Sequence, residues 1–371
     1  MTRLSPLDAL GPAFRRTREV LAQPFRFWFF LKIALVAALT QPGFYSASIS
    51  YPIDGANFAT MSRLPHHQTF VAPSLAMFGL VAIIIGAIAG FVLWIGITYL
   101  YCRLRFTLFD LVVHKRGRVG QAWSSYGRQA WRYFGLVILT SLAFLVVAAA
   151  IIGPAILNAV RVVGPLAAAG SNANPFAMLS AMLPLLLAIF AVAALWALAD
   201  ALMQDFLLPP MAIEDAPLES AFGRFFGLLK SDFGSVAIYV LLRFAVGIGL
   251  VWILLMLLFV VLGLGGLMIF GVGTLLYHAL WTSMLGQVVC VALAIVVGLI
   301  ALSIYLVAMI SVHGIAAVFQ QSYSAYFYGG RYPALGDRLE PPLVVDAIEP
   351  PTAPSTGSPL IPPWSEPPAV W

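Results

Sequence analysis

The sequence predicts an all-α integral membrane protein with about six transmembrane helices. Of its 371 residues 61% are hydrophobic and only 9% are charged, whereas soluble domains are typically about 45–50% apolar and about 25% charged. Apolar runs of about 20 residues recur along the chain, which is the length that an α-helix needs to cross a bilayer. These runs are too long for the strands of a membrane barrel, so helices are the expected spanning elements.

The six spans are expected within one transmembrane domain, 25–335, between a basic N-terminal segment, 1–24, and a proline-rich tail, 336–371. The expected spans are 25–45, 74–101, 134–159, 179–202, 234–262 and 286–314. The arginines before the first span resemble the start of a signal peptide. However, Lys32 interrupts the apolar run and no small-residue cleavage site follows, so we expect an uncleaved span.

The positions of lysine and arginine predict the orientation of these spans. Basic residues gather before the first span, between the second and third, between the fourth and fifth, and after the sixth, whereas the segments on the other side carry only Arg63 and Arg161. The positive-inside rule then places both termini in the cytoplasm, with the protein in the inner (plasma) membrane. Because the charges flank apolar spans, the net charge of +5 does not indicate binding to nucleic acid.

The long apolar stretch that begins with the fifth expected span leaves the number of spans open. Between Phe233 and Tyr277 the only charged residue is Arg243, and a helix over that length would extend about 67 Å, more than one span requires. The glycine-rich run Gly263–Gly273 is therefore expected to be a re-entrant or interfacial element within 263–277. The alternative is a seventh span, which would place the tail outside the cell.

Two cytoplasmic segments align when the chain is shifted by 99 residues. The aligned residues are Ala122, Trp123, Tyr126, Ala130, Phe134 and Gly135 with Ala221, Phe222, Phe225, Leu229, Phe233 and Gly234. This pattern predicts two repeats, at about 80–159 and 180–262, in which two spans flank an amphipathic helix lying in the membrane interface.

The two repeated loops differ in charge. The first is basic, with Lys115, Arg116 and Arg118 near its centre, and the second is acidic, with Glu214, Asp215 and Glu219. We expect opposite charges to favour side-by-side packing of the two loops, although each exposed pair contributes only about 0–1 kcal/mol. In the second loop, Asp215 is also expected to cap the amphipathic helix at its N-terminus, ahead of Pro217 in the first turn.

Three stretches of sequence carry a resemblance to a known group of proteins. They are "QDFLLPPMAIED" (Gln204–Asp215), "AFGRFFGLL" (Ala221–Leu229) and "FQQSYSAYFYGGRY" (Phe319–Tyr332). With them, residues 20–335 resemble a broad group of uncharacterised prokaryotic polytopic membrane proteins related to the membrane domain of some glycerophosphodiester phosphodiesterases. The segment after the last span is far shorter than the roughly 250 residues of a TIM barrel, so we expect no phosphodiesterase domain and transfer no catalytic residue.

The candidate ligand or ion-pair site consists of Arg243, Asp200 and Asp205. Arg243 lies about ten residues into the fifth expected span, where an unpaired charge would cost several kcal/mol. In a structural interpretation Arg243 snorkels to the interface or pairs with Asp200. In a functional interpretation it binds an anionic substrate or a lipid headgroup. Asp205 follows Asp200 at the inner end of the preceding span and is the third candidate.

The sequence predicts no catalytic, cofactor or metal site. Six acidic residues fall within 200–232, but their spacing matches no known metal-binding motif and no histidine lies among them. His66 and His67 are expected in an external loop. Cys102 and Cys290 are expected at opposite ends of different spans, too far apart for a disulfide.

We therefore expect a non-enzymatic multi-pass membrane protein that acts in transport, lipid handling or the assembly of a membrane complex. The alternatives are a small-molecule or lipid transporter with its site around Arg243, and a membrane-embedded lipid enzyme. The expected partners are the lipid bilayer and other membrane proteins, bound either through the proline-rich tail or by formation of a homo-oligomer.

Overall fold

The computed structural model describes residues 4–22, 26–41, 73–114, 119–168, 175–281 and 283–340, and in these ranges the ordered elements are all helices. In chain order they are α1 (Leu10–Ala22), α2 (Phe27–Leu39), α5 (Pro73–His114), α6 (Val119–Ser125), α7 (Gly127–Ala168), α8 (Pro175–Leu202), the π-helix η2 (Met203–Leu207), α9 (Leu208–Glu214), α10 (Leu218–Ser231), α11 (Phe233–Leu280), α12 (Met284–Gly329) and α13 (Pro333–Leu339). Within the described ranges, five helices are long and apolar enough to cross a membrane: α5, α7, α8 continued by η2 and α9, α11, and α12. The all-α membrane fold is thus confirmed.

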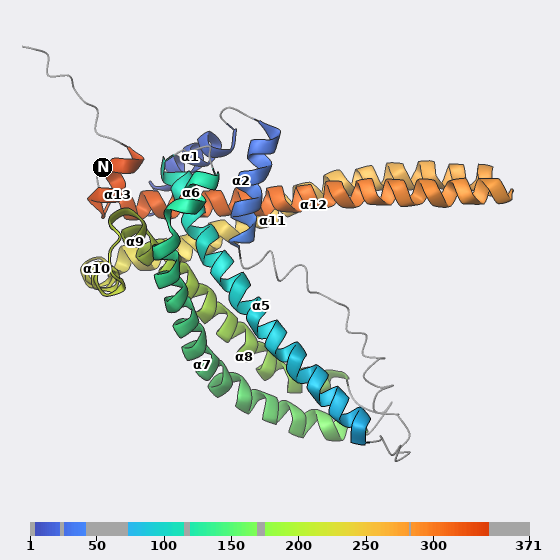
Figure 1. Ribbon diagram of the computed structural model, residues 1–371, viewed down its shortest axis with the longest axis horizontal. Coiled ribbons are helices and arrows are strands. Elements are labelled where there is room, and N and C mark those ends of the chain that lie inside the picture. The colour runs from blue at the N-terminus through green and yellow to red at the C-terminus, as the bar shows by residue number, and fades with distance from the viewer. Residues whose placement is uncertain are drawn as a thin grey trace, which may run out of the picture.

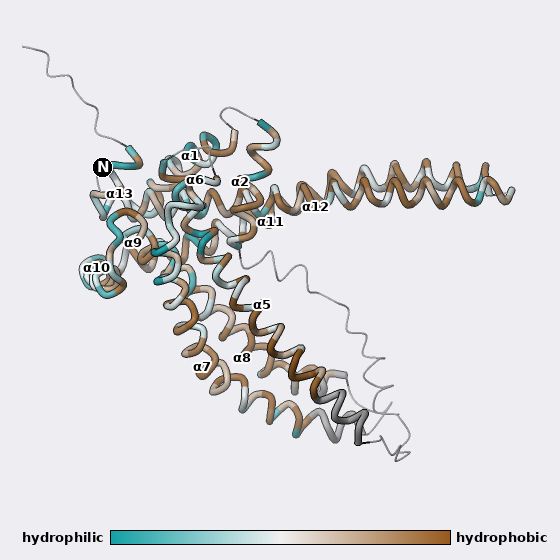
Figure 2. Tube along the Cα trace, in the orientation of Figure 1, coloured by the Kyte–Doolittle hydropathy of each residue, from teal (hydrophilic) through white to brown (hydrophobic). Residues whose placement is uncertain are grey.

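The helices form two arms that diverge from a common junction (Figure 1). We call α5, α7 and α8 the bundle arm, and the antiparallel pair α11 and α12 the hairpin arm. The junction consists of the arm bases and the short helices α1, α2, α6, α9, α10 and α13. Hydrophobic residues dominate the arms, whereas most hydrophilic segments lie at the junction (Figure 2).

The arms have the surface and length expected of membrane-embedded helices. In the hairpin arm, Phe259, Met268 and Phe270 each leave more than two thirds of their surface exposed, at 73%, 75% and 70%. Such continuous apolar surface is stable when lipid covers it. The part of α12 from Met284 to Ser311 would extend about 42 Å, close to the full thickness of a bilayer.

The core of the protein lies in the junction, where the C-terminal halves of α5 and α12 are buried on almost all sides. Phe106, Leu108 and Phe109 of α5 have no exposed surface, and α12 is buried along most of its length from Val312 to Gly329. Short helices pack around these two segments, with α1 and α2 lying against α12. The ends of the long helices, rather than their membrane portions, therefore hold the protein together.

The expected first span, 25–45, is wrong in extent within the described residues. The helix there, α2, has 13 residues and would reach about 20 Å, short of the roughly 30 Å hydrocarbon core. Its small side chains Ala34, Ala37 and Ala38 are buried in the junction. The apolar character of this segment therefore reflects burial against protein, which hydropathy alone does not distinguish from burial in lipid.

The expected break within 263–277 is also wrong, because α11 is one continuous helix from Phe233 to Leu280. A Cβ added at Gly263, Gly265 or Gly273 would meet no atom within 4 Å, so these glycines do not mark a tight turn. In lipid, a continuous helix keeps every backbone group hydrogen-bonded. The chain reverses instead just before α12, where the Ser283 hydroxyl accepts a hydrogen bond from the Gly286 amide, at 3.1 Å.

Two further expectations need correction, one at the loop before α10 and one at the boundary of the tail. Asp215 does not cap α10; it ends α9 in a left-handed conformation with φ of 52°, and α10 begins only at Leu218. Aspartate is one of the few residues that tolerate this conformation. The ordered fold also extends past the expected boundary at 335, because Leu335 and Leu339 of α13 are buried. The remaining tail, the loop carrying His66 and His67, and residues 115–118 lie outside the described residues.

The contact between α2 and α12 yields a prediction about stability. A Cβ at Gly314 would lie 2.6 Å from the Cα and carbonyl oxygen of Ala34, and backbone atoms cannot move aside locally. Gly314→Ala should therefore destabilise the protein by about 1–3 kcal/mol, measured as a lower midpoint of thermal unfolding in detergent. Gly298→Ala, on the same helix with no atom within 4 Å, is the matched control. Equal midpoints for the two variants would contradict the close contact.

The left-handed conformation of Asp215 yields a second prediction. Asp215→Asn and Asp215→Val both remove the carboxylate, but only asparagine accepts a positive φ readily. The valine variant should therefore unfold with a free energy about 1–2 kcal/mol lower than the asparagine variant. Chemical unfolding in mixed micelles provides the measurement, and two variants of equal stability would exclude this backbone conformation.

Candidate functional site

A buried ion pair links α5 to α8 at the base of the bundle arm. The Nη1 of Arg105 lies 2.8 Å from the Oδ1 of Asp200, and its Nη2 contacts the second carboxylate oxygen. Arg105 has no exposed surface and Asp200 retains 6%. Two-point contact between a guanidinium and a carboxylate is the strongest geometry available to such a pair.

Two tyrosines complete the surroundings of Arg105. The Tyr133 hydroxyl on α7 accepts a hydrogen bond from Arg105 Nη1 at 3.0 Å. The ring of Tyr101, one turn before Arg105 on α5, lies 4.2 Å from the guanidinium carbon. Arg105 therefore joins the three helices of the bundle arm through one side chain.

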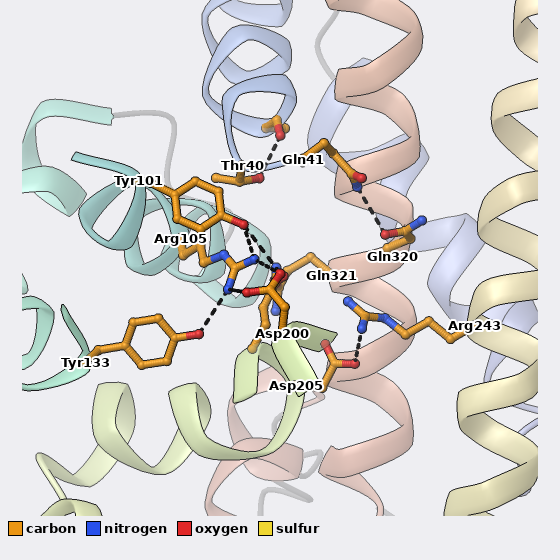
Figure 3. A network of polar contacts seen from close by, with 12 residues as sticks. Thr40, Gln41, Tyr101, Arg105, Tyr133, Asp200, Asp205, Arg243, Gln320 and Gln321 are labelled. Atoms are coloured by element: carbon orange, nitrogen blue, oxygen red, sulfur yellow. Dashed lines mark hydrogen bonds and ion pairs between the residues drawn. The ribbon is translucent and has the colours of Figure 1, made fainter. Parts of the chain in front are cut away.

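A second buried ion pair links the hairpin arm to the same segment of chain. The Nη1 of Arg243 on α11 lies 3.0 Å from the Oδ2 of Asp205 on η2, and the Tyr239 hydroxyl donates to the same oxygen at 2.7 Å. Figure 3 shows Arg105 and Arg243 approaching the two carboxylates from opposite sides. The expected pairing of Arg243 with Asp200 is thus wrong: each aspartate has its own arginine.

The π-helix η2 explains why both carboxylates are available to the junction. In a regular α-helix, residues five positions apart, such as Asp200 and Asp205, are separated by about 140° around the axis, and a wider π turn reduces that angle. The cause lies just downstream, where Pro209 and Pro210 cannot donate to the carbonyls four residues earlier and their rings clash with them. Leu208 bonds instead to the Met203 carbonyl, five residues back.

A cavity of about 280 Å³ lies beside the two ion pairs, between α8 of one arm and α11 of the other. Its polar lining consists of Thr40, Gln41, Asp200, Gln204, Arg243 and Gln320. Its apolar lining consists of Ala197, Ala201, Phe244, Gly247, Ile248, Val251 and Trp252. The cavity is thus amphiphilic and lies where the two arms diverge.

Glutamine side chains shape the polar end of the cavity. Gln41 donates from Nε2 to Gln320 Oε1 at 3.0 Å, and Gln204 donates from Nε2 to Gln321 Oε1 at 2.9 Å. A Cβ at position 247 would lie 2.3 Å from Gln320 Nε2. Gly247 therefore provides the space that the Gln320 amide occupies between α12 and α11.

The structure thus brings the predicted site residues Arg243, Asp200 and Asp205 together at the junction. The sequence alone did not point to Arg105 or to the glutamines that line the cavity. Arg105 follows the second expected span, 74–101, and basic residues in such a position usually fix topology. One signal was available: seven of the ten residues from Leu104 to Val113 are apolar, which is consistent with a helix that remains buried beyond the membrane.

Asp215 and Glu214 form surface ion pairs. Asp215 contacts Arg128 and lies 3.3 Å from Arg132 Nη1, so the acidic loop before α10 does contact basic residues of α7. Glu214 Oε2 lies 2.6 Å from Arg224 Nη2. Among the described residues, no group of three or more His, Cys, Asp or Glu side chains is arranged to hold a metal ion. Cys102 and Cys290 are free thiols on different helices.

A family model matches residues 4–338, a range that includes both arms and the helices of the junction except the last residue of α13. The chain belongs to DUF7544, a family of unknown function. No curated protein and no solved structure matches the chain. Membership of DUF7544 therefore identifies the fold unit, and the site must be interpreted from its own chemistry.

The burial of the Arg105–Asp200 pair yields a prediction. Arg105→Met leaves Asp200 buried and unpaired, and Asp200→Leu does the same to Arg105, so each should lower the free energy of unfolding by about 3–5 kcal/mol. The double variant should be more stable than either single variant, because no charge remains unpaired. Unfolding in mixed micelles provides the measurement.

The exposed pair of Arg15 and Glu340, with side chains 64% and 46% exposed, is the matched control. Removal of either partner there should cost about 0–1 kcal/mol. If Arg105→Met and Arg15→Met had equal effects, the Arg105–Asp200 pair could not be buried as described.

Proposed function

We propose that this chain is a non-enzymatic multi-pass protein of the inner membrane that handles lipid by holding the polar part of an amphiphile between its two arms. The observation that carries the proposal is the cavity at the junction. Charged and amide side chains line one part of it, and Ile248, Val251 and Trp252 line another. Sites for small ligands commonly combine apolar walls with a few polar groups that fix orientation.

The position of the cavity favours a ligand that enters from the membrane. Its apolar walls come from α8 and α11, one helix from each arm, and the apolar arms diverge from that point (Figures 1 and 2). Lipid tails would cover the exposed apolar side chains of α8 and α11, such as Phe190 and Trp252, that the contacts with α7 and α12 leave uncovered. A volume of about 280 Å³ is small for a whole ligand, since typical pockets occupy about 300–1,000 Å³, but it accommodates a headgroup.

The contacts of the chain ends support a shared location of both termini, which we place in the cytoplasm. The Tyr323 hydroxyl donates to the Pro6 carbonyl at 3.0 Å, and Arg331 Nη1 donates to the Leu4 carbonyl at 3.1 Å. The N-terminal segment and the end of α12 therefore lie on the same side of the arms. The concentration of basic residues in the junction then favours the cytoplasmic side by the positive-inside rule.

The proposed internal repeat fits this arrangement. In each proposed repeat, a short helix that follows a long one contributes a small and an aromatic side chain to the junction. These are Ala122 and Tyr126 near α6, and Ala221 and Phe225 on α10, and all four are buried. We interpret α10, with charged residues on its other side, as the interfacial helix. The resemblance to the membrane domain of glycerophosphodiester phosphodiesterases is compatible with a role near lipid headgroups and remains part of the proposal.

A transporter of lipids or small molecules is the second candidate, and one observation favours it. The cavity lies between the two arms, and the Arg243–Asp205 pair joins the hairpin arm to the segment that continues α8. Movement of one arm relative to the other would therefore change the shape of the cavity. Binding sites at the boundary of two moving units are common in transporters. Both candidates require that the cavity binds a ligand.

Filling the cavity tests this requirement. Ala197 lines it from α8, and Ala197→Trp should reduce the lipid retained by the purified protein about tenfold, corresponding to about 1.4 kcal/mol. Native mass spectrometry of detergent-solubilised protein with added phospholipids measures the retained lipid. Ala191→Trp, on the same helix but outside the cavity, is the matched control. If both variants retained as much lipid as the unaltered protein, the cavity would not be the site.

A further inference from the structure

The cavity combines one arginine and one aspartate with uncharged amides, and this balance of charge restricts its ligand. Of the described residues that line it, only Arg243 and Asp200 are charged. Each is already paired behind the cavity wall, Arg243 with Asp205 and Asp200 with Arg105. The four side chains together therefore carry no net charge.

We infer that the cavity binds a headgroup with no net charge, either zwitterionic or uncharged, and this inference rests on the proposed function. An isolated arginine in a span would favour an anion, as the sequence suggested for Arg243. Asp205 removes that preference, because its carboxylate, which retains only 1% exposure, already neutralises the guanidinium.

The cost of moving buried charges explains why a net charge on the ligand is unfavourable. An anion that took Arg243 from Asp205 would leave the aspartate unpaired in a buried site, and a broken buried pair is strongly destabilising. An anion that left the pair intact would bring an unbalanced charge into surroundings of low dielectric constant. A cation approaching Asp200 meets the same difficulty, because Arg105 holds both of its oxygens.

A neutral headgroup avoids both costs and finds hydrogen-bonding partners. Gln41, Gln204 and Gln320 provide amide groups that can donate and accept, and Thr40 adds a hydroxyl. A zwitterion can direct its positive group toward Asp200 and its negative group toward Arg243 without separating either pair. An uncharged glycerol headgroup can bond to the amides alone, and in both cases the tails leave past Val251 and Trp252.

Competition between defined lipids tests the inference. The purified, unaltered protein is equilibrated with equal amounts of diacylglycerol, phosphatidylethanolamine and phosphatidylglycerol, and native mass spectrometry measures which of them it retains. We expect one or both neutral lipids to be retained about tenfold more than phosphatidylglycerol, a difference of about 1.4 kcal/mol. Ala197→Trp should remove this retention, and Ala191→Trp should leave it unchanged.

Asp205→Asn provides a test in the opposite direction, because it frees the charge of Arg243. This variant should shift the preference toward phosphatidylglycerol, about tenfold relative to the unaltered protein. The amide side chain keeps the volume of the carboxylate and can still accept a hydrogen bond from Tyr239. The ranking of lipids by the unaltered protein requires no variant, so the inference remains testable if Asp205→Asn does not fold.

The outcomes separate the inference from the proposed function. If phosphatidylglycerol bound most tightly, or if all three lipids bound equally, and Ala197→Trp removed the bound lipid, the inferred preference for a neutral headgroup would be wrong. The proposed lipid-handling function would still hold. Lipid retention that Ala197→Trp does not change would reject the proposed function itself.

Discussion

The structure depends on one short segment, Asp200 to Leu207, that carries two buried aspartates, Asp200 and Asp205. Arg105 of the bundle arm and Arg243 of the hairpin arm each form an ion pair with it. Buried ion pairs contribute little net stability compared with apolar contacts, but breaking one is costly. They therefore act mainly as constraints on geometry: the two arms are held at the same short segment of chain, and the cavity forms between them.

The proline pair that follows this segment determines its shape. Pro209 and Pro210 prevent a regular α-helix through η2, and the widened turn allows both carboxylates to face the junction. Two residues that would normally break a helix thus position the charges on which the site depends. The stretch that contains them is also one of those that resemble other polytopic membrane proteins, although the resemblance alone did not indicate this geometry.

Much of the fold could be predicted from the sequence, because burial in lipid leaves long apolar runs that are easy to recognise. The all-α class, the five long helices and the grouping of Arg243, Asp200 and Asp205 followed from those runs and from the scarcity of charge within them. The pairing of each aspartate with its own arginine could not be predicted, because Arg105 looks like an ordinary topology-setting residue and a π turn leaves no periodic signal in the sequence. The sequence predicts a full span where the structure has only the short helix α2, because hydropathy does not distinguish burial in protein from burial in lipid.

The place of α12 at the centre of the junction has a consequence for biosynthesis. Thr17 and Gln41, near the start of the chain, have side-chain hydrogen-bonding partners in Ser322 and Gln320, which are among the last residues of the fold to be synthesised. The N-terminal helices can therefore complete these contacts only after most of α12 has been synthesised. Contacts between such distant parts of a chain form slowly, so the buried faces of α1 and α2 lack their α12 partners during that interval.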